Sequence, residues 1–228
     1  STATSEDSAE ASFAGLQDTY LWVRGADNVL QAVRACWASL YSVESVSYRL
    51  RLKLPERAVA MGVVVQRMVN SRSSGVMFTR SPTTGDRSVI AIEGSWGLGS
   101  CIVSGEVTPD KFVVSKVTGE ISHRTVSQKL LQHVPGEEGV QHVSVEDERQ
   151  SIACVSDAEI RELAEVAKSI ERHYGVPQDI EWAIEDGTVY LLQSRPETVW
   201  ATREAKPVAA PKERAFDHVL SLLSGGRK

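Results

Sequence analysis

Residues 156–195 constrain the fold more strongly than any other segment. They predict a helix with a clear beginning and end and, directly after it, a β-hairpin. Ser156 and Glu159 form a capping-box pattern at the start of an apolar stripe with helical spacing. Gly175 follows the last residue of that stripe, where a left-handed glycine commonly ends a helix. Two β-rich runs then flank Asp186-Gly187, a dipeptide typical of tight hairpin turns. A helix beside antiparallel strands predicts an α+β fold with mixed or antiparallel sheets and flanking helices.

The rest of the chain predicts two more helices and four more strands. Asp27 is expected to cap the first helix, and residues 134–154 show no clear period. The composition changes after Trp200 to Ala, Pro and alternating charge, so we expect one globular domain over residues 1–200 and a linker and tail over 201–228. The predicted helices are Ala26–Tyr41 and Glu44–Leu54, and the predicted strands are Ala60–Val69, Gly75–Thr79, Ser88–Glu93 and Lys111–Lys116.

Charge and cysteine content exclude several classes of protein. Lys and Arg number 25 and Asp and Glu number 30, for a net charge of −5, so neither a nucleic-acid partner nor an anionic membrane is expected. Cys36, Cys101 and Cys154 are odd in number and widely spaced, which predicts neither a disulfide framework nor a zinc site. The apolar runs are too short to span a bilayer, and a cytoplasmic protein is the expectation.

The hairpin carries polar residues that are unusual for a plain sheet. Asp179 and Glu181 lie on its first strand, and Gln193 and Arg195 on its second. Carboxylate and amide oxygens are the ligands that Mg²⁺ prefers, and a guanidinium suits phosphate oxygens. On these residues alone, a solvated edge with cross-strand ion pairs explains the pattern equally well.

The register of the hairpin decides whether those four side chains can act together. A two-residue loop would place Glu181 and Gln193 on opposite faces of the sheet. A three-residue loop, Glu185-Asp186-Gly187, with a left-handed glycine and a bulge, places Asp179 opposite Gln193 and keeps Glu181 and Arg195 on the same side. We predict the three-residue loop, because only this register brings the four polar side chains to one face of the sheet.

Three other segments suggest contacts with a nucleotide, although each is also compatible with ordinary structure. The small-residue loop at 11–20 could bring backbone N–H groups to phosphates, or could be only a loop. The run 63–69 is expected to be a buried strand, whose end could meet an adenine. The glycines of 93–99 suggest a close backbone approach to a ligand, but they match neither the dinucleotide-binding order nor a P-loop.

Taken in this order, the four segments resemble the N-terminal nucleotide-binding region of the phosphoenolpyruvate synthase, pyruvate phosphate dikinase and rifampin phosphotransferase family. The resemblance runs from Ser1 to about Val199 and implies a partial ATP-grasp nucleotide-binding domain. It implies that Gly15 and Thr19 contact the phosphates or ribose of ATP and that the adenine is held by Gln66, Met68 and Val69. It further implies that Mg²⁺ is held by Glu181, Gln193 and Asp179. Arg195 would be the catalytic cation at a phosphate.

The sequence departs from the family pattern in two respects. Family sequences begin earlier, with an ATP-contacting Lys and with an Arg just before the position of Ser1, so we expect a fragment, a truncated form or a split subunit. Ser100 stands where the family usually has a Glu. None of the five histidines lies in the Thr-Ser-His context of the family's phosphate carrier, and His133 and His142 show no spacing typical of a metal site.

The resemblance implies an ATP-dependent phosphotransferase of the dikinase type, with ATP and Mg²⁺ as cofactors. Such enzymes pass the β-phosphoryl group of ATP to a histidine on another domain or subunit, then to a small-molecule acceptor, and release AMP and phosphate. The acceptor remains open between pyruvate, a glucan, a phenol and an antibiotic. The alternative is a non-catalytic or regulatory subunit that binds nucleotide or a partner without turnover, and we expect this chain alone to be inactive.

Overall fold

The computed structural model describes residues 2–3, 7–8, 11–12, 18–51, 60–137, 139–198 and 200. The chain divides into two units, Ser1–Glu197 and Thr198–Lys228. The expected linker and tail over residues 201–228 lie outside the described residues. Within the part of the chain that is described, no helix is both long and apolar enough to cross a membrane.

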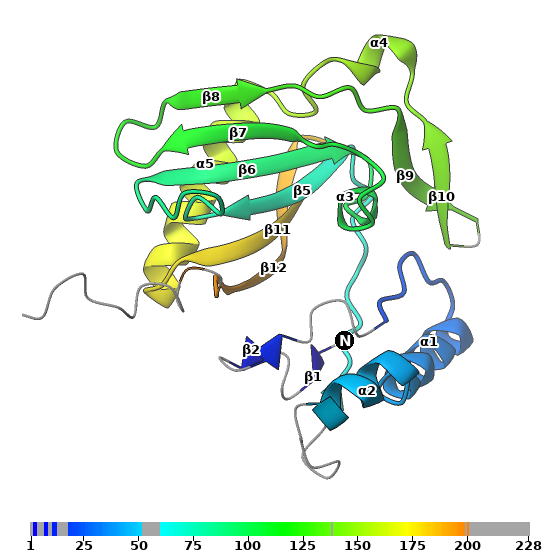
Figure 1. The fold of residues 1–228 in the computed structure, drawn as a ribbon. Coiled ribbons are helices and arrows are strands. Elements are labelled where there is room, and N and C mark those ends of the chain that lie inside the picture. The colour runs from blue at the N-terminus through cyan, green and yellow to red at the C-terminus, as the bar shows by residue number, and fades with distance from the viewer. Residues whose placement is uncertain are drawn as a thin grey trace, which may run out of the picture. The chain divides into compact units, whose positions relative to one another are not determined.

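The main sheet of the first unit has six strands in the order β12-β11-β5-β6-β7-β8 (Figure 1). Every neighbouring pair in it is antiparallel. The α+β class with antiparallel sheets and flanking helices is confirmed, as are the strands predicted near 75–79, 88–93 and 111–116. The strands are β5 (Ser73–Phe78), β6 (Val89–Trp96), β7 (Asp110–Ser115), β8 (Ile121–Thr125), β11 (Gln178–Glu185) and β12 (Thr188–Pro196).

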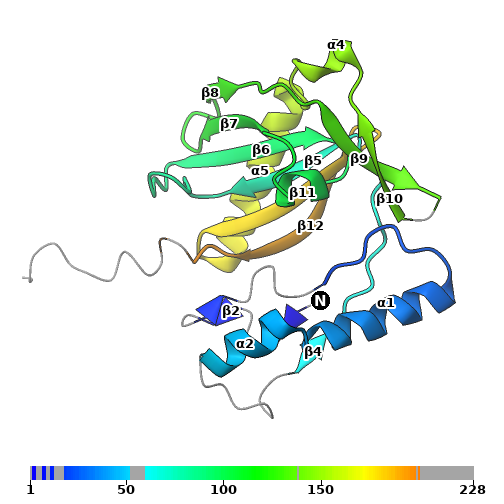
Figure 2. The same cartoon turned by 45° about the vertical axis from the view of Figure 1, so that its right-hand side comes forward.

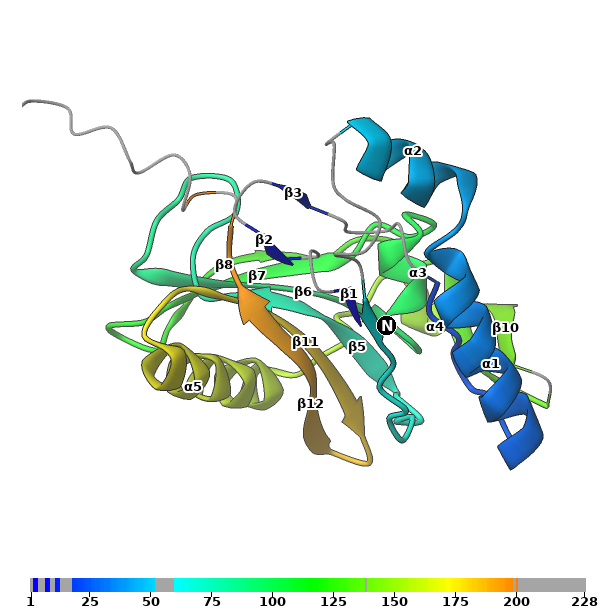
Figure 3. The same cartoon turned by 90° about the horizontal axis from the view of Figure 1, so that it is seen from below.

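Helix α5 (Asp157–Tyr174) covers one face of this sheet, as Figures 1 and 3 show. Its predicted capping box is confirmed, because Ser156 Oγ accepts from the Glu159 N–H while the Glu159 carboxylate accepts from the Ser156 N–H. Gly175 ends the helix in the left-handed conformation, with φ at 72°. Between helix and sheet lies the buried core, which includes Met77, Ile90, Ile92, Trp96, Phe112, Val114, Ile160, Leu163, Ala164, Ala167, Ile180, Trp182 and Ile184.

The stretch without a clear period forms a second hairpin beside a short helix (Figure 2). Strand β9 (Leu131–Gly136) pairs with β10 (Gly139–Ser144), and α4 (Asp147–Gln150) follows. Only two of the β9 residues are fully buried and none of the β10 residues is, so no alternation of apolar and polar residues marks these strands. The hairpin meets α3 (Ser100–Val103), which follows the glycine segment after β6.

Two helices near the N-terminus confirm the predicted helical stretches within the described residues. They are α1 (Ala26–Ser39) and α2 (Val43–Arg51). The predicted cap of α1 is wrong, because Gly25, with φ at 83°, precedes the helix and Asp27 lies in its first turn. An acidic residue in the first turn still suits the positive end of the helix dipole.

The strand predicted over residues 60–69 is mostly wrong. Only β4 (Met61–Gly62) has strand geometry there, paired with β1 (Thr2–Ala3), and β2 (Asp7–Ser8) pairs with β3 (Ala11–Ser12). Val64 and Val65 are exposed rather than buried. An apolar run therefore lies here outside any sheet formed by the described residues.

The β11–β12 hairpin combines features of both registers considered from the sequence. Its turn is the two-residue loop Asp186-Gly187, with positive φ values of 49° and 76°. A bulge beside Glu181 then shifts the pairing by one residue, so that Glu181 lies opposite Gln193 and Asp179 opposite Arg195. The predicted three-residue loop and the pairing of Asp179 with Gln193 are wrong. The four polar side chains nevertheless share one face of the sheet.

A fully buried ion pair joins three segments at one end of β7. Lys129 Nζ lies 2.6 Å from Asp110 Oδ1, and both side chains are 0% exposed. The Asp110 carboxylate also accepts from the backbone N–H groups of Ser127 and Cys154, and the ammonium donates to the Ser127 carbonyl. Both charges thus have several partners in place of water, which a buried pair requires.

Lys129→Met should lower the free energy of unfolding by about 3–5 kcal/mol, because it leaves the Asp110 carboxylate buried without its counter-ion. Lys168→Met is the matched control, since Lys168 pairs with Glu165 on the more exposed side of α5. That control should cost no more than about 1 kcal/mol. Urea denaturation of both variants measures the difference, and equal losses would contradict a special role for the buried pair.

Candidate functional site

The sheet face opposite α5 carries a row of polar side chains. Pairing across β12, β11, β5, β6 and β7 places Gln193, Glu181, Val76, Glu93 and Lys111 side by side. The residues that alternate with them point into the core, so this row faces away from α5. The ammonium of Lys111 lies 2.9 Å from the carboxylate of Glu93. One surface thus presents two carboxylates, an amide and an ammonium in line.

An ion pair lies directly beside this row. Arg195 Nε and Nη2 both donate to Asp179 Oδ2, at 2.9 and 2.8 Å. Asp179 precedes Glu181 by two residues on the same strand, so their Cα atoms are about 6–7 Å apart on one face. The structure therefore brings together the four hairpin residues predicted from the sequence. Their oxygen donors suit a hard cation such as Mg²⁺, and the guanidinium suits phosphate oxygens.

The surroundings of Glu181 disfavour a negative charge. Burial raises its pKa above the ordinary value of 4.5, and the charge of Asp179 raises it further, while Arg195 partly offsets both effects. The ionised carboxylate is therefore destabilised by lost hydration. A cation bound beside it would favour the ionised form, which is the arrangement expected of a metal ligand before the metal arrives.

Three residues expected to contact the nucleotide line a separate cavity. Thr19, Gln66 and Met68 lie around a cavity of about 110 Å³, whose other lining residues are mainly apolar and come from the segment before α1, from α1 and from the run 63–65. Ligand pockets for molecules of nucleotide size usually have volumes of about 300–1,000 Å³. In this conformation the cavity therefore has room for part of a nucleotide only.

Gln66 connects this cavity with the hairpin. Its Nε2 donates to the Leu192 carbonyl at 3.4 Å, next to Gln193 in the chain. Val69 is half-buried and does not line the cavity. Gly15 lies outside the described residues, so its expected contact with the phosphates stays a prediction.

Two glycines, one in β6 and one directly after it, have a packing role that the sequence did not indicate. A Cβ atom at Gly94 would lie 2.9 Å from the ring of Trp182, and one at Gly97 would lie 2.2 Å from the His133 carbonyl oxygen. Gly97 also has φ at 75°, which favours glycine. Contacts within the protein therefore explain these two glycines without a ligand.

Sequence reasoning missed Glu93 and Lys111 as members of the polar row. The signal was present, because Glu93 alternates with buried residues along β6 and Lys111 does the same along β7. Their place beside Glu181 depends on the order of the strands, in which β5 and β6 separate β11 from β7. That order is a property of the tertiary fold and not of local spacing.

Comparison with known proteins identifies the class of the domain. The family model for the pyruvate phosphate dikinase AMP/ATP-binding domain matches residues 1–215. The chain is 48% identical over 198 residues to the probable phosphoenolpyruvate synthase of Methanothermobacter thermautotrophicus, which covers 87% of this chain and 29% of that protein. It is 44% identical over 226 residues to that of Methanocaldococcus jannaschii, covering 99% of this chain and 19% of the relative.

A further relative is the phosphoenolpyruvate synthase of Pyrococcus furiosus, 45% identical over 207 residues, with 87% of this chain and 25% of that protein covered. The chain spans less than a third of the length of each of these three relatives. The fold and the family match define a nucleotide-binding domain. More specifically, the chain belongs to the pyruvate phosphate dikinase AMP/ATP-binding domain family, which confirms the resemblance seen in the sequence.

The raised pKa of Glu181 sets the direction of a pH effect on stability. Between its unfolded value, near 4.5, and its higher folded value, the folded chain binds more protons than the unfolded chain. The free energy of unfolding should therefore fall as the pH rises through this window. Glu181→Gln removes this titration. The free energy of unfolding of the variant, measured relative to that of wild type, should therefore increase between about pH 4 and about pH 7.

Urea denaturation at both pH values measures this effect. Glu162→Gln is the control, because Glu162 is an exposed residue of α5 on the opposite side of the sheet. We expect its difference from wild type to be nearly the same at both pH values. A Glu181→Gln profile parallel to that of wild type would contradict the assigned desolvation of Glu181.

Proposed function

We propose that the chain is the ATP-binding part of a dikinase-type phosphotransferase similar to phosphoenolpyruvate synthase, with an ATP-grasp-type nucleotide site. The β-phosphoryl group of ATP would pass to a histidine on another domain or subunit and then to a small-molecule acceptor, with release of AMP and phosphate. The observation that supports this most is the pairing of Glu181 with Gln193, beside the Asp179–Arg195 ion pair, on the face of the sheet opposite α5.

The donor set at this face fits Mg²⁺. Glu181, Gln193 and Asp179 offer carboxylate and amide oxygens, and no imidazole or thiol is among these candidates. When bound by these residues, Mg²⁺ would supply positive charge that offsets the negative charge developing on the phosphates during transfer. Arg195 would contact a phosphate oxygen through its guanidinium, held in place by its cross-strand bond to Asp179. Gln66, Met68 and Val69 would lie at the adenine, and Thr19 with Gly15 at the ribose or phosphates.

A second candidate is a non-catalytic subunit that binds the nucleotide without turnover. The observation that favours it is Ser100, which stands where the family usually has a Glu. Its hydroxyl is bonded to His133 Nδ1 at 2.7 Å and supplies no carboxylate to a metal. Both candidates predict nucleotide binding, and only the first predicts phosphoryl transfer.

Glu181→Gln should weaken ATP binding in the presence of Mg²⁺ by about tenfold or more, which corresponds to about 1.4 kcal/mol. The loss should be much smaller with EDTA, because the substitution removes a charge that acts through the metal. Isothermal titration calorimetry measures both affinities, and Glu162→Gln should bind like wild type. Failure of the wild-type chain to bind ATP–Mg²⁺ at millimolar concentration would contradict both candidates.

The 228-residue polypeptide should form no AMP from ATP by itself, because it contains no histidine in the carrier context. A polypeptide with the family's opening segment and carrier-histidine domain should restore AMP formation if the chain is catalytic. Thin-layer chromatography of labelled ATP measures the product. AMP formed by the pure chain and abolished by Glu181→Ala would contradict a separate carrier, and no AMP from the mixture would favour the non-catalytic candidate.

A further inference from the structure

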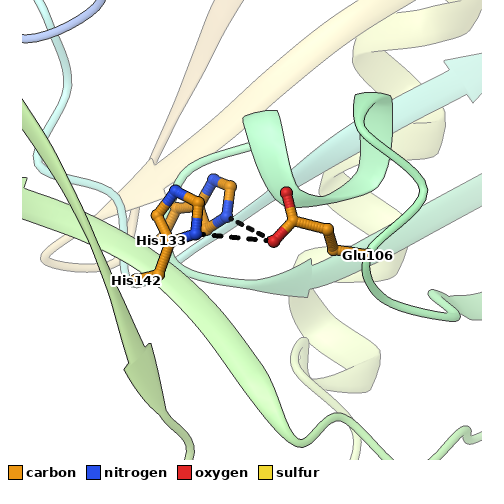
Figure 4. A group of neighbouring side chains, drawn as sticks. All are labelled: Glu106, His133 and His142. Atoms are coloured by element: carbon orange, nitrogen blue, oxygen red, sulfur yellow. Dashed lines mark hydrogen bonds and ion pairs between the residues drawn. The ribbon is translucent and has the colours of Figure 1, made fainter.

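Glu106, His133 and His142 form a second cluster of potential ligands, and none of them belongs to the polar row (Figure 4). The ligand atoms of the three side chains all lie within 4.8 Å of one another. His133 Nε2 and His142 Nδ1 each lie 3.5 Å from Glu106 Oε2. A tetrahedral ion with bonds of about 2.1 Å would place its ligand atoms about 3.4 Å apart, so the two measured separations are close to those of a zinc site.

The fold holds two of these side chains in place. His133 and His142 are directly paired across β9 and β10, and their rings stack with centroids 3.8 Å apart. His133 is buried, and its Nδ1 lies 2.7 Å from Ser100 Oγ. If Nδ1 carries the proton and donates it to Ser100, Nε2 is left with a lone pair that faces Glu106. Such outer hydrogen bonds commonly orient the histidine ligands of metal sites.

The donor atoms of the cluster also suit a cation. Glu106 Oε2 is the carboxylate oxygen that faces both imidazoles. Two imidazoles and one carboxylate are a ligand set found in zinc sites that keep a position open for water. Imidazole nitrogens favour zinc and similar transition metals, whereas Mg²⁺ prefers oxygen ligands.

We propose that Glu106, His133 and His142 bind one divalent transition-metal ion of the zinc type, with water as the fourth ligand. The metal lies in the plane of each ligating imidazole, so the stacked rings must tilt apart on binding. His142 can turn, because 54% of its side chain is exposed. The ion would link the β9–β10 hairpin to the segment after β6, where the Leu98 N–H already donates to the His133 carbonyl at 2.8 Å.

Titration of the 228-residue chain with Co²⁺ tests the site directly, because tetrahedral cobalt with nitrogen and oxygen ligands has visible absorption bands and zinc should displace it. We expect one equivalent to bind with a Kd of about 1 µM or tighter. His142→Ala and Glu106→Gln should each abolish the bands. Ser100→Ala should weaken binding by about 10–100-fold, which is typical when a partner of a ligand is lost.

Two controls separate the site from nonspecific binding and from misfolding. His173→Ala removes an exposed histidine at the end of α5 and should leave the titration unchanged. Circular dichroism should show that His142→Ala keeps the fold, since its side chain is half-exposed. Saturable binding that survives both His142→Ala and Glu106→Gln, or no saturable binding by wild type, would overturn the proposal. No nucleotide is present, so the outcome is independent of the proposed phosphotransfer function.

Discussion

The buried contact between Asp110 and Lys129 fixes how the sheet and its helix meet. One carboxylate receives the ammonium and the backbone N–H of Ser127 on one side, and the N–H of Cys154 on the other. It thereby holds the start of β7, the segment that leads into β9 and the segment that leads into α5. Because the loss of one partner leaves a desolvated charge, these three segments cannot separate without a large cost. The helix is thus held against the core face, and the polar row lies on the opposite face of the sheet.

Much of this architecture could be predicted from local patterns. The capping box at Ser156, the left-handed Gly175 and the alternation along β5 to β7 are local signals, and the structure confirms each of them. The β11–β12 hairpin shows a feature that local sequence patterns do not determine. The Asp186-Gly187 turn favours one register and the division into polar and apolar faces favours the other. A bulge beside Glu181 satisfies both requirements, and nothing in the local sequence specifies where such a bulge falls.

The sequence-based predictions that were wrong or incomplete failed for different physical reasons. The run 63–69 has strand-like composition, but a strand forms only where a neighbouring strand is available, and the described residues provide one only at Met61–Gly62. His133 and His142 lie at equal distances from the turn of their hairpin, but its weak alternation concealed the pairing. The polar row depends on the order of five strands, so sequence spacing predicted its hairpin half and missed Glu93 and Lys111.

The two clusters differ in the chemistry that they can support, and Ser100 is the residue that distinguishes them. The polar row offers carboxylate and amide oxygens with a guanidinium nearby, which suits Mg²⁺ and phosphate. The cluster at Glu106 offers two imidazoles, which suit a softer ion. A Glu at position 100 would place a carboxylate where Ser100 now bonds His133 Nδ1 at 2.7 Å. A hydroxyl and a carboxylate can both accept a hydrogen bond from Nδ1–H and so orient His133 as a ligand. Ser100 therefore provides the outer hydrogen bond of the metal site that we propose, although it supplies no carboxylate.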